Sequence, residues 1–179
     1  MLYTLSQISI GISTCIYSSS LLLKSKYKML TVQIISSLFF VAHYFLLSEL
    51  LAGFVGVVEI IRLVSFFLLE RKESLNTNKN RIILGIIFTI ACSICAYFTW
   101  TGIYCILPLI ATMVVNITLS LKSVFFYKLG AIIYTVLTIA FLFIIGSTFG
   151  AISQCVVLIF GLIGIILYFY QQKNKNLNN

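Results

Sequence analysis

Two oppositely charged residues stand three positions apart inside a long apolar stretch of this chain. Glu59 and Arg62 are the only charged residues between Leu51 and Leu69. Residues three apart share one face of a helix, so the carboxylate and the guanidinium can pair. A charge near the middle of a bilayer is costly unless it meets a partner or water. The pair therefore predicts either a substrate or proton site lining a central cavity, or a structural ion pair that fixes a helix in a bundle.

Three further polar residues are candidates for the same site. His43 could face Glu59 across a helical hairpin and titrate near neutral pH, or it could be a neutral ring bonded to a backbone carbonyl or a hydroxyl. Thr112 and Asn116 follow Pro108 at steps of four, so they lie on one helical stripe. The Asn116 amide could bind a solute hydroxyl or amide, although such groups also bond helices to one another.

Small residues and a proline could let the helices pack closely or bend. Gly11, Gly53, Gly56 and Pro108 are the candidates for packing or hinge positions. Gln154 is expected to bond helices together rather than to bind a solute.

A second kind of chemistry is suggested by cysteines. Cys92 and Cys95 form a C-x-x-C pair at helical spacing, and Cys105 and Cys155 are expected at similar depth. A membrane thiol–quinone oxidoreductase would need such a pair, but burial in apolar helix disfavours reactive thiolates. A metal site is not expected, because only His43 could add a nitrogen ligand. No soluble-enzyme motif is present in the sequence, so an enzyme and a bound cofactor are not expected.

The elements that position these residues must be membrane helices. Hydrophobic residues make up 61% of the 179 positions and charged residues only 9%, which is far from the composition of a soluble domain. A membrane helix needs about 20 apolar residues. The sequence predicts seven such spans: Thr4 to Leu22, Leu30 to Ser48, Leu51 to Leu69, Ile82 to Thr99, Ile103 to Leu121, Tyr127 to Gly146 and Phe149 to Tyr170.

The distribution of charge predicts an orientation. The formal net charge is +8, but the basic residues follow alternate spans, which is typical of topology rather than of nucleic-acid binding. They are Lys24, Lys26, Lys28, Arg71, Lys72, Lys79, Arg81, Lys122, Lys128, Lys173 and Lys175. The other connections carry only Glu49 as a charge. The positive-inside rule then places the amino terminus outside and the carboxyl terminus in the cytoplasm.

The connections also suggest a division of the chain. Short outer turns make the second and third, fourth and fifth, and sixth and seventh spans antiparallel neighbours. A polar stretch from Glu70 to Arg81 divides the chain. We expect a first three-helix bundle (1–72), a linker with a linker helix (73–102) and a second three-helix bundle with a short tail (103–179), which would form a 3+1+3 parallel repeat.

Several short segments resemble a known family. They are His43-Tyr44-Phe45-Leu46-Leu47, Gly53, Arg62, Leu107-Pro108, Gly146-Ser147 and Gly150. On these segments the chain resembles the YgjV-type bacterial inner-membrane proteins, which are similar in helix plan to the SWEET and PnuC transporters. The resemblance implies a small inner-membrane protein and suggests passage of a small solute. The paired proline hinges of SWEET and PQ-loop proteins are not reproduced, because Pro108 has no counterpart in the first span.

These observations favour two hypotheses about function. The first is a small-solute transporter or facilitator with a midplane site between two three-helix bundles. The alternative is a non-transporting membrane assembly or regulatory protein, and the thiol–quinone enzyme is the weakest reading. The expected partners are the lipid bilayer and a small solute, with a homo-oligomer left open and no nucleic acid.

Overall fold

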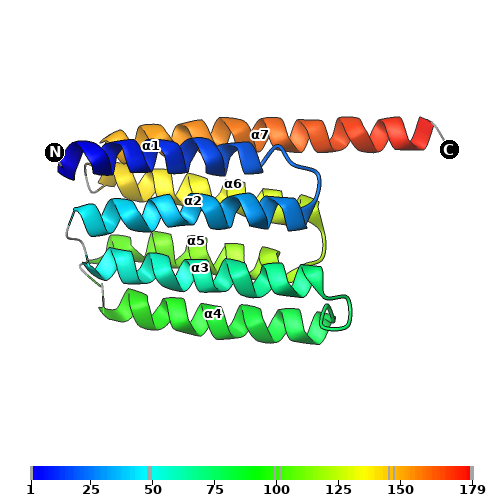
Figure 1. The fold of residues 1–179 in the computed structure, drawn as a ribbon, viewed down its shortest axis with the longest axis horizontal. Helices are drawn as coiled ribbons and strands as arrows, with labels where there is room; N and C mark the ends of the chain where they lie inside the picture. The colour runs from blue at the N-terminus through cyan, green and yellow to red at the C-terminus, as the bar shows by residue number, and fades with distance from the viewer. Residues whose placement is uncertain are drawn as a thin grey trace.

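The computed structural model describes residues 2–47, 50–98, 100, 102–144, 146 and 148–177. They form seven long helices (Figure 1). These are α1 (Leu2–Ser20), α2 (Lys26–Leu46), α3 (Leu50–Arg71), α4 (Asn78–Phe98), α5 (Ile106–Ser120), α6 (Val124–Ile144) and α7 (Thr148–Leu177), with a short 3-10 turn, η1 (Ile103–Cys105), before α5. Each predicted span corresponds to one helix, and the described residues contain no strand. The prediction of an all-α fold is confirmed.

Over the described residues, five helical segments are long and apolar enough to cross a membrane. They are Lys26–Leu46, Asn78–Phe98, Ile103–Ser120, Val124–Ile144 and Thr148–Lys173. α1 is less apolar because it is rich in serine, and α3 carries the charges of Glu59, Arg62, Glu70 and Arg71. The number of seven crossings therefore stays a prediction.

Part of the bundle interior is polar, unlike that of a soluble protein. The buried residues of α1 are all serines: Ser6, Ser9, Ser13, Ser18 and Ser20. Large apolar side chains lie on the outside instead, among them Ile86, Ile90 and Ile166, each more than half exposed. A soluble protein would bury such residues, whereas lipid tails accept them. The distribution is that of a protein surrounded by a bilayer.

Small polar residues hold α1 against α2. The Ser13 hydroxyl donates to the Ser36 carbonyl at 3.0 Å, and the Ser36 hydroxyl donates to the Ser13 carbonyl at 2.8 Å. Ser9 donates to the Phe39 carbonyl at 2.8 Å. Short side chains allow two membrane helices to approach closely while their hydroxyls remain bonded.

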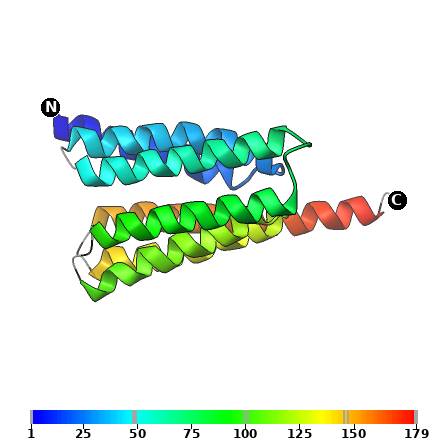
Figure 2. The ribbon, with the colours of Figure 1, turned by 90° about the horizontal axis from the view of Figure 1, so that it is seen from below.

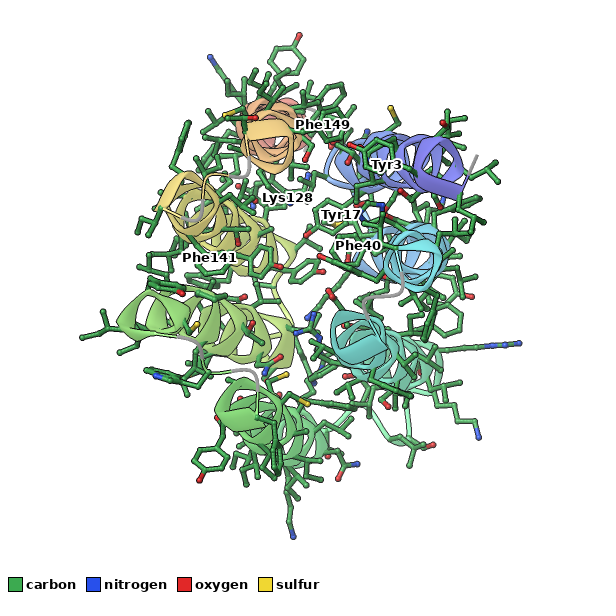
Figure 3. The ribbon with its side chains drawn as sticks, turned by 90° about the vertical axis from the view of Figure 1, so that its left-hand side faces the viewer. Tyr3, Tyr17, Phe40, Lys128, Phe141 and Phe149 are labelled. Atoms are coloured by element: carbon green, nitrogen blue, oxygen red, sulfur yellow. The ribbon has the colours of Figure 1, made fainter. Side chains whose placement is uncertain are left out.

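The helices form two layers that close into a ring. α1, α2 and α3 make one layer, and α4, α5, α6 and α7 make the other (Figure 2). Consecutive helices pack together around the ring, and α1 contacts α7 to close it (Figure 3). The predicted neighbour pairs α2/α3, α4/α5 and α6/α7 are confirmed. α4 contacts α5 more extensively than it contacts α3, so the two layers meet less closely at this seam.

The connections between helices alternate between the two ends of the bundle (Figure 1). We call the end that holds the α1–α2, α3–α4 and α5–α6 connections the basic end, because these connections and the adjoining helix ends carry Lys24, Lys72 and Lys122. The other end is called the opposite end. Ser48, Glu49, Thr99 and Ser147, which the sequence places in turns there, lie outside the described residues.

The helices begin at other residues than the predicted spans, and the differences at α2 and α5 bear on the site. α2 begins at Lys26 rather than at Leu30, since the Lys26 ammonium is buried in a polar cluster described below. α5 begins at Ile106, which places Pro108 in its first turn. The first N–H groups of a helix have no intrahelical partner, so a proline here is tolerated without a bend.

Candidate functional site

Arg62 is the centre of a polar cluster between the two layers. It lies on α3, its guanidinium Nη2 donates to Glu59 Oε1 at 3.0 Å, and its Nη1 donates to Asn116 Oδ1 at 3.0 Å. The first contact is the predicted pairing of residues three apart. The second joins α3 of one layer to α5 of the other. The side chain of Arg62 is 7% exposed and that of Glu59 is 33% exposed, so the carboxylate is the more accessible partner.

Asn116 extends this cluster into the second layer. Its side chain is fully buried, and its Nδ2 donates to the Thr89 hydroxyl of α4 at 3.2 Å. Its amide therefore accepts from α3 and donates to α4, which is the arrangement expected of a group that bonds helices together. Thr112, one turn earlier on α5, bonds its hydroxyl to the Pro108 carbonyl at 2.8 Å.

A cavity lies beside the ion pair, between the layers. Its volume is about 360 Å³, and its lining includes Glu59, Arg62, Thr112 and Pro108. A smaller polar chamber of about 70 Å³ adjoins it and shares Phe40, Glu59 and Tyr134 as lining residues. Figure 3 looks along the helices and shows Phe40, Tyr17 and Phe141 inside the ring. The Glu59 carboxylate stands where the two spaces meet.

The cavity extends from the ion pair toward the opposite end. Its lining residues include Tyr44 near the end of α2, Val55 near the start of α3, Ala96 near the end of α4 and Phe141 near the end of α6. All of these positions lie on the same side of Arg62 along the bundle. The two layers are thus separated by space over this half of the bundle.

The other half is closed by a cluster of buried charges at the basic end. Lys26 Nζ donates to the carbonyls of Leu119 at 2.6 Å and Leu121 at 2.5 Å, where α5 ends. Glu70 Oε1 lies 3.6 Å from Lys26 Nζ and 2.5 Å from Arg81 Nη2. The C-terminal carbonyls of a helix lack intrahelical partners and attract cations. This basic-end cluster of Lys26, Glu70 and Arg81 ties α2 and α3 to α4 and α5.

Comparison with known proteins identifies the family. A family model described as a bacterial inner membrane protein, Imp-YgjV, matches residues 4–173. The chain belongs to the Imp-YgjV family. No curated protein and no solved structure matches it. The predicted family is confirmed, and with it a bacterial inner-membrane protein, while the similarity in helix plan to SWEET and PnuC transporters stays a prediction.

In this Imp-YgjV protein His43 points away from the ion pair. Its Nδ1 lies 2.8 Å from the Ser6 carbonyl of α1, and it does not line either chamber. His43 therefore contacts a backbone carbonyl, which was the second of its two predicted roles, and does not face Glu59. Among the predicted site residues, Glu59, Arg62 and Thr112 line the larger cavity, and Asn116 stands behind Arg62.

The three glycines predicted to permit close helix packing differ in how near their neighbouring atoms lie. A Cβ on Gly56 would come within 2.6 Å of a Val41 methyl carbon, and one on Gly53 would come within 3.0 Å of the Phe45 ring, so both permit the contact of α2 with α3. A Cβ on Gly11 would meet nothing within 4 Å. Gly11 therefore does not permit a close helix contact here, and bending at Gly11 stays a prediction.

The cysteines of this family member are more accessible than the sequence suggested. Cys92, Cys95 and Cys105 are half-buried and line the cavity, whereas Cys155 is exposed. The expectation that apolar helix would enclose Cys92, Cys95 and Cys105 is wrong, because α4 and η1 place these three beside the space between the layers. Over the described residues, no group of three or more His, Cys, Asp or Glu side chains could hold a metal ion.

Sequence reasoning missed the basic-end cluster. Lys26 and Arg81 were counted as topology signals and Glu70 as the start of a connection, yet Lys26 is 4% and Arg81 is 1% exposed. The rarity of acidic residues could have indicated this cluster, since the chain has only four Asp and Glu residues. A carboxylate at an end rich in Lys and Arg is expected to form ion pairs, and Glu70 pairs with Lys26 and Arg81.

Proposed function

We propose that this protein is a small-solute transporter or facilitator whose site is the cavity at Glu59 and Arg62. The observation that carries the proposal is the cavity of about 360 Å³ between the two helix layers, with an ion pair at its inner end. Ionisable residues inside a membrane are costly and mark solute or ion pathways by default. A pocket near 300 Å³ is at the small end of ligand sites, so the solute is small.

The asymmetry of the bundle supports a transport cycle. The cavity extends toward the opposite end, while the basic-end cluster holds the layers together at the other. A carrier must exchange such a state for one in which the closed end has opened. In our proposal the layers rock about the midplane, the basic end faces the cytoplasm with the carboxyl terminus, and the amino terminus lies outside.

The proposal also keeps the finer predictions about the chain. Helices α1–α3 and α5–α7 would be two parallel triplets with α4 between them, and all seven helices would cross the inner membrane. The protein would act without enzymatic chemistry, in contact with lipid and with its solute, either alone or as a homo-oligomer.

Accessibility of the cavity to water tests the proposal. In a cysteine-free background, Thr112→Cys places a thiol at the cavity and Ile117→Cys places one on the outer face of the same helix, where Ile117 is 63% exposed. A charged, membrane-impermeant thiol reagent should label position 112 and spare position 117, because only a water-filled space admits it. Labelling is measured in intact cells and in inverted vesicles. Protection of position 112 from both sides would overturn the proposal.

A second candidate, a membrane assembly protein, rests on a different observation. An apolar groove of about 410 Å³ runs between α4 and α5, and its lining includes Ile86, Ile90, Met113 and Ile117. A helix of another protein could lie in such a groove. A dry cavity in the labelling experiment would favour this candidate.

A further inference from the structure

The charge that the cavity presents is negative, although the ion pair beside it is neutral. Glu59 is 33% exposed and lines both chambers, whereas the Arg62 side chain is 7% exposed. Both terminal nitrogens of Arg62 are engaged, Nη1 with Asn116 and Nη2 with Glu59. Only Oε1 of Glu59 accepts from Arg62, so the other carboxylate oxygen is the group best placed to meet a solute.

Aromatic rings form much of the remaining wall. Phe40 and Tyr44 come from α2 in one layer, and Tyr134 and Phe141 come from α6 in the other. Phe40 and Phe141 both lie inside the ring of helices (Figure 3). The faces of aromatic rings carry negative electrostatic potential and attract cations within about 6 Å. The rings and the carboxylate therefore favour the same sign of charge.

An anion finds little to bind in this space. Arg62 is the one cationic residue among those that line the two chambers. Its Nη1 and Nη2 already donate to Asn116 and Glu59, and its Nε is enclosed by protein, so little of its charge faces the cavity. The described lining thus discriminates against negatively charged solutes.

We propose that the cavity binds a small organic ammonium ion, with its N–H groups donating to the Glu59 carboxylate and its apolar body lying against the aromatic rings. This inference rests on the proposed function and names the solute class of the same site. A volume of about 360 Å³ accommodates one small ring with a short side arm rather than a large substrate.

Three probes of nearly equal size test the sign of charge. Benzylammonium, benzyl alcohol and benzoate carry the same ring with a positive, a neutral and a negative group. The purified full chain keeps Cys92 as its single cysteine, because Cys92 lines the cavity, and its rate of modification by a thiol reagent is measured with each probe. Benzylammonium should slow the modification at concentrations where benzyl alcohol and benzoate do not. Equal protection by all three, protection by none, or stronger protection by benzoate would overturn the inference.

Two variants separate the contributions of the carboxylate and the rings. Glu59→Gln keeps a hydrogen-bond acceptor but removes the charge, so protection by benzylammonium should be lost. Phe141→Leu keeps an apolar side chain at the cavity and should weaken protection by about threefold to tenfold. Phe143→Leu is the matched control on α6, since Phe143 is 64% exposed on the outer face. If Glu59→Gln does not fold, the pair Phe141→Leu and Phe143→Leu still decides, and equal effects of these two would contradict the inference.

The outcomes also distinguish this inference from the proposed function. If the Cys92 thiol reacts in the absence of probes but is protected by benzoate, the cavity is water-filled, as transport requires. The inference that it binds an ammonium ion would then be wrong. A Cys92 thiol that never reacts with a charged reagent refutes the cavity itself, and the inference with it.

Discussion

At the scale of single residues, the two members of the Glu59–Arg62 pair are not equivalent. Both residues line the cavity of about 360 Å³, but the Arg62 side chain is only 7% exposed whereas that of Glu59 is 33% exposed. A charge that loses its partner in a dry environment is costly, and one that can meet water is less so. The pair therefore has a buried half and an accessible half.

This difference predicts unequal effects of removing each partner. Glu59→Ala leaves the buried guanidinium without its counter-ion and should lower the free energy of unfolding by about 3 to 5 kcal/mol. Arg62→Met leaves a carboxylate that water in the cavity can reach, so the loss should be smaller, about 1 to 3 kcal/mol. Thermal unfolding in detergent micelles measures both. A larger loss for Arg62→Met would mean that the cavity is dry at Glu59.

Asn116 gives a second prediction at this scale. Asn116→Ala removes the acceptor for Arg62 and the donor to Thr89, so we expect a loss of about 1 to 2 kcal/mol in stability. Ile117→Ala, at the neighbouring exposed position, is the control and should change stability little. Equal effects would show that the amide contacts contribute nothing beyond packing.

At the scale of helices, small residues decide how closely α7 approaches α1. A Cβ added to Gly164 would lie 2.3 Å from the Leu21 carbonyl oxygen, and the nearby Lys128 ammonium donates to the Gly164 carbonyl at 3.0 Å. Because this oxygen belongs to the backbone of Leu21, it cannot rotate away as a side chain could. The contact of the first helix with the last therefore depends on the absence of a side chain at this position.

The same substitution at two glycines should have opposite effects. Gly164→Ala should separate α7 from α1 and destabilise the fold by about 2 kcal/mol or more. Gly11→Ala meets no atom within 4 Å and should stabilise α1 by roughly 0.5 to 1 kcal/mol, as alanine does in a helix interior. Melting temperatures of the two variants check this. Destabilisation by Gly11→Ala would indicate an unseen neighbour, such as a second copy of the chain.

The helices themselves were largely predictable from the sequence, because hydropathy and span length determine where a membrane helix can form. Their ends were less so. α2 begins at Lys26 because a carboxylate and two helix-end carbonyls from other helices surround its ammonium, and no local pattern contains those partners. The pairing of Glu59 with Arg62 is local and was predictable, but the bond from Arg62 to Asn116 depends on how α3 meets α5.

At the scale of the whole molecule, polar contacts between the layers are concentrated near the basic end. The basic-end cluster joins them there, and the Tyr127 hydroxyl of α6 donates to the Gln33 amide oxygen of α2. Toward the opposite end the cavity separates the layers. Loosening the basic-end cluster should therefore shift the whole protein toward a state that is open at that end.

Glu70→Gln tests this shift, because it removes the charge that Lys26 and Arg81 share. In inverted vesicles, where the basic end is expected to face the reagent, labelling of Thr112→Cys should become severalfold faster. Glu73→Gln is the control, since Glu73 is exposed in the same connection. Faster labelling in both variants, or in neither, would argue against a gate made by the cluster.

The serine-rich face of α1 has a consequence for how the protein is made. α1 is not among the helical segments that are long and apolar enough to span a membrane by themselves. Its hydroxyls find their partners on α2, at Ser36 and Phe39. We expect α1 to partition into lipid together with α2, as a hairpin that the insertion machinery releases in one step. Replacing the serines of α1 by alanine should let the helix insert alone, at the expense of the contacts that later hold it in the bundle.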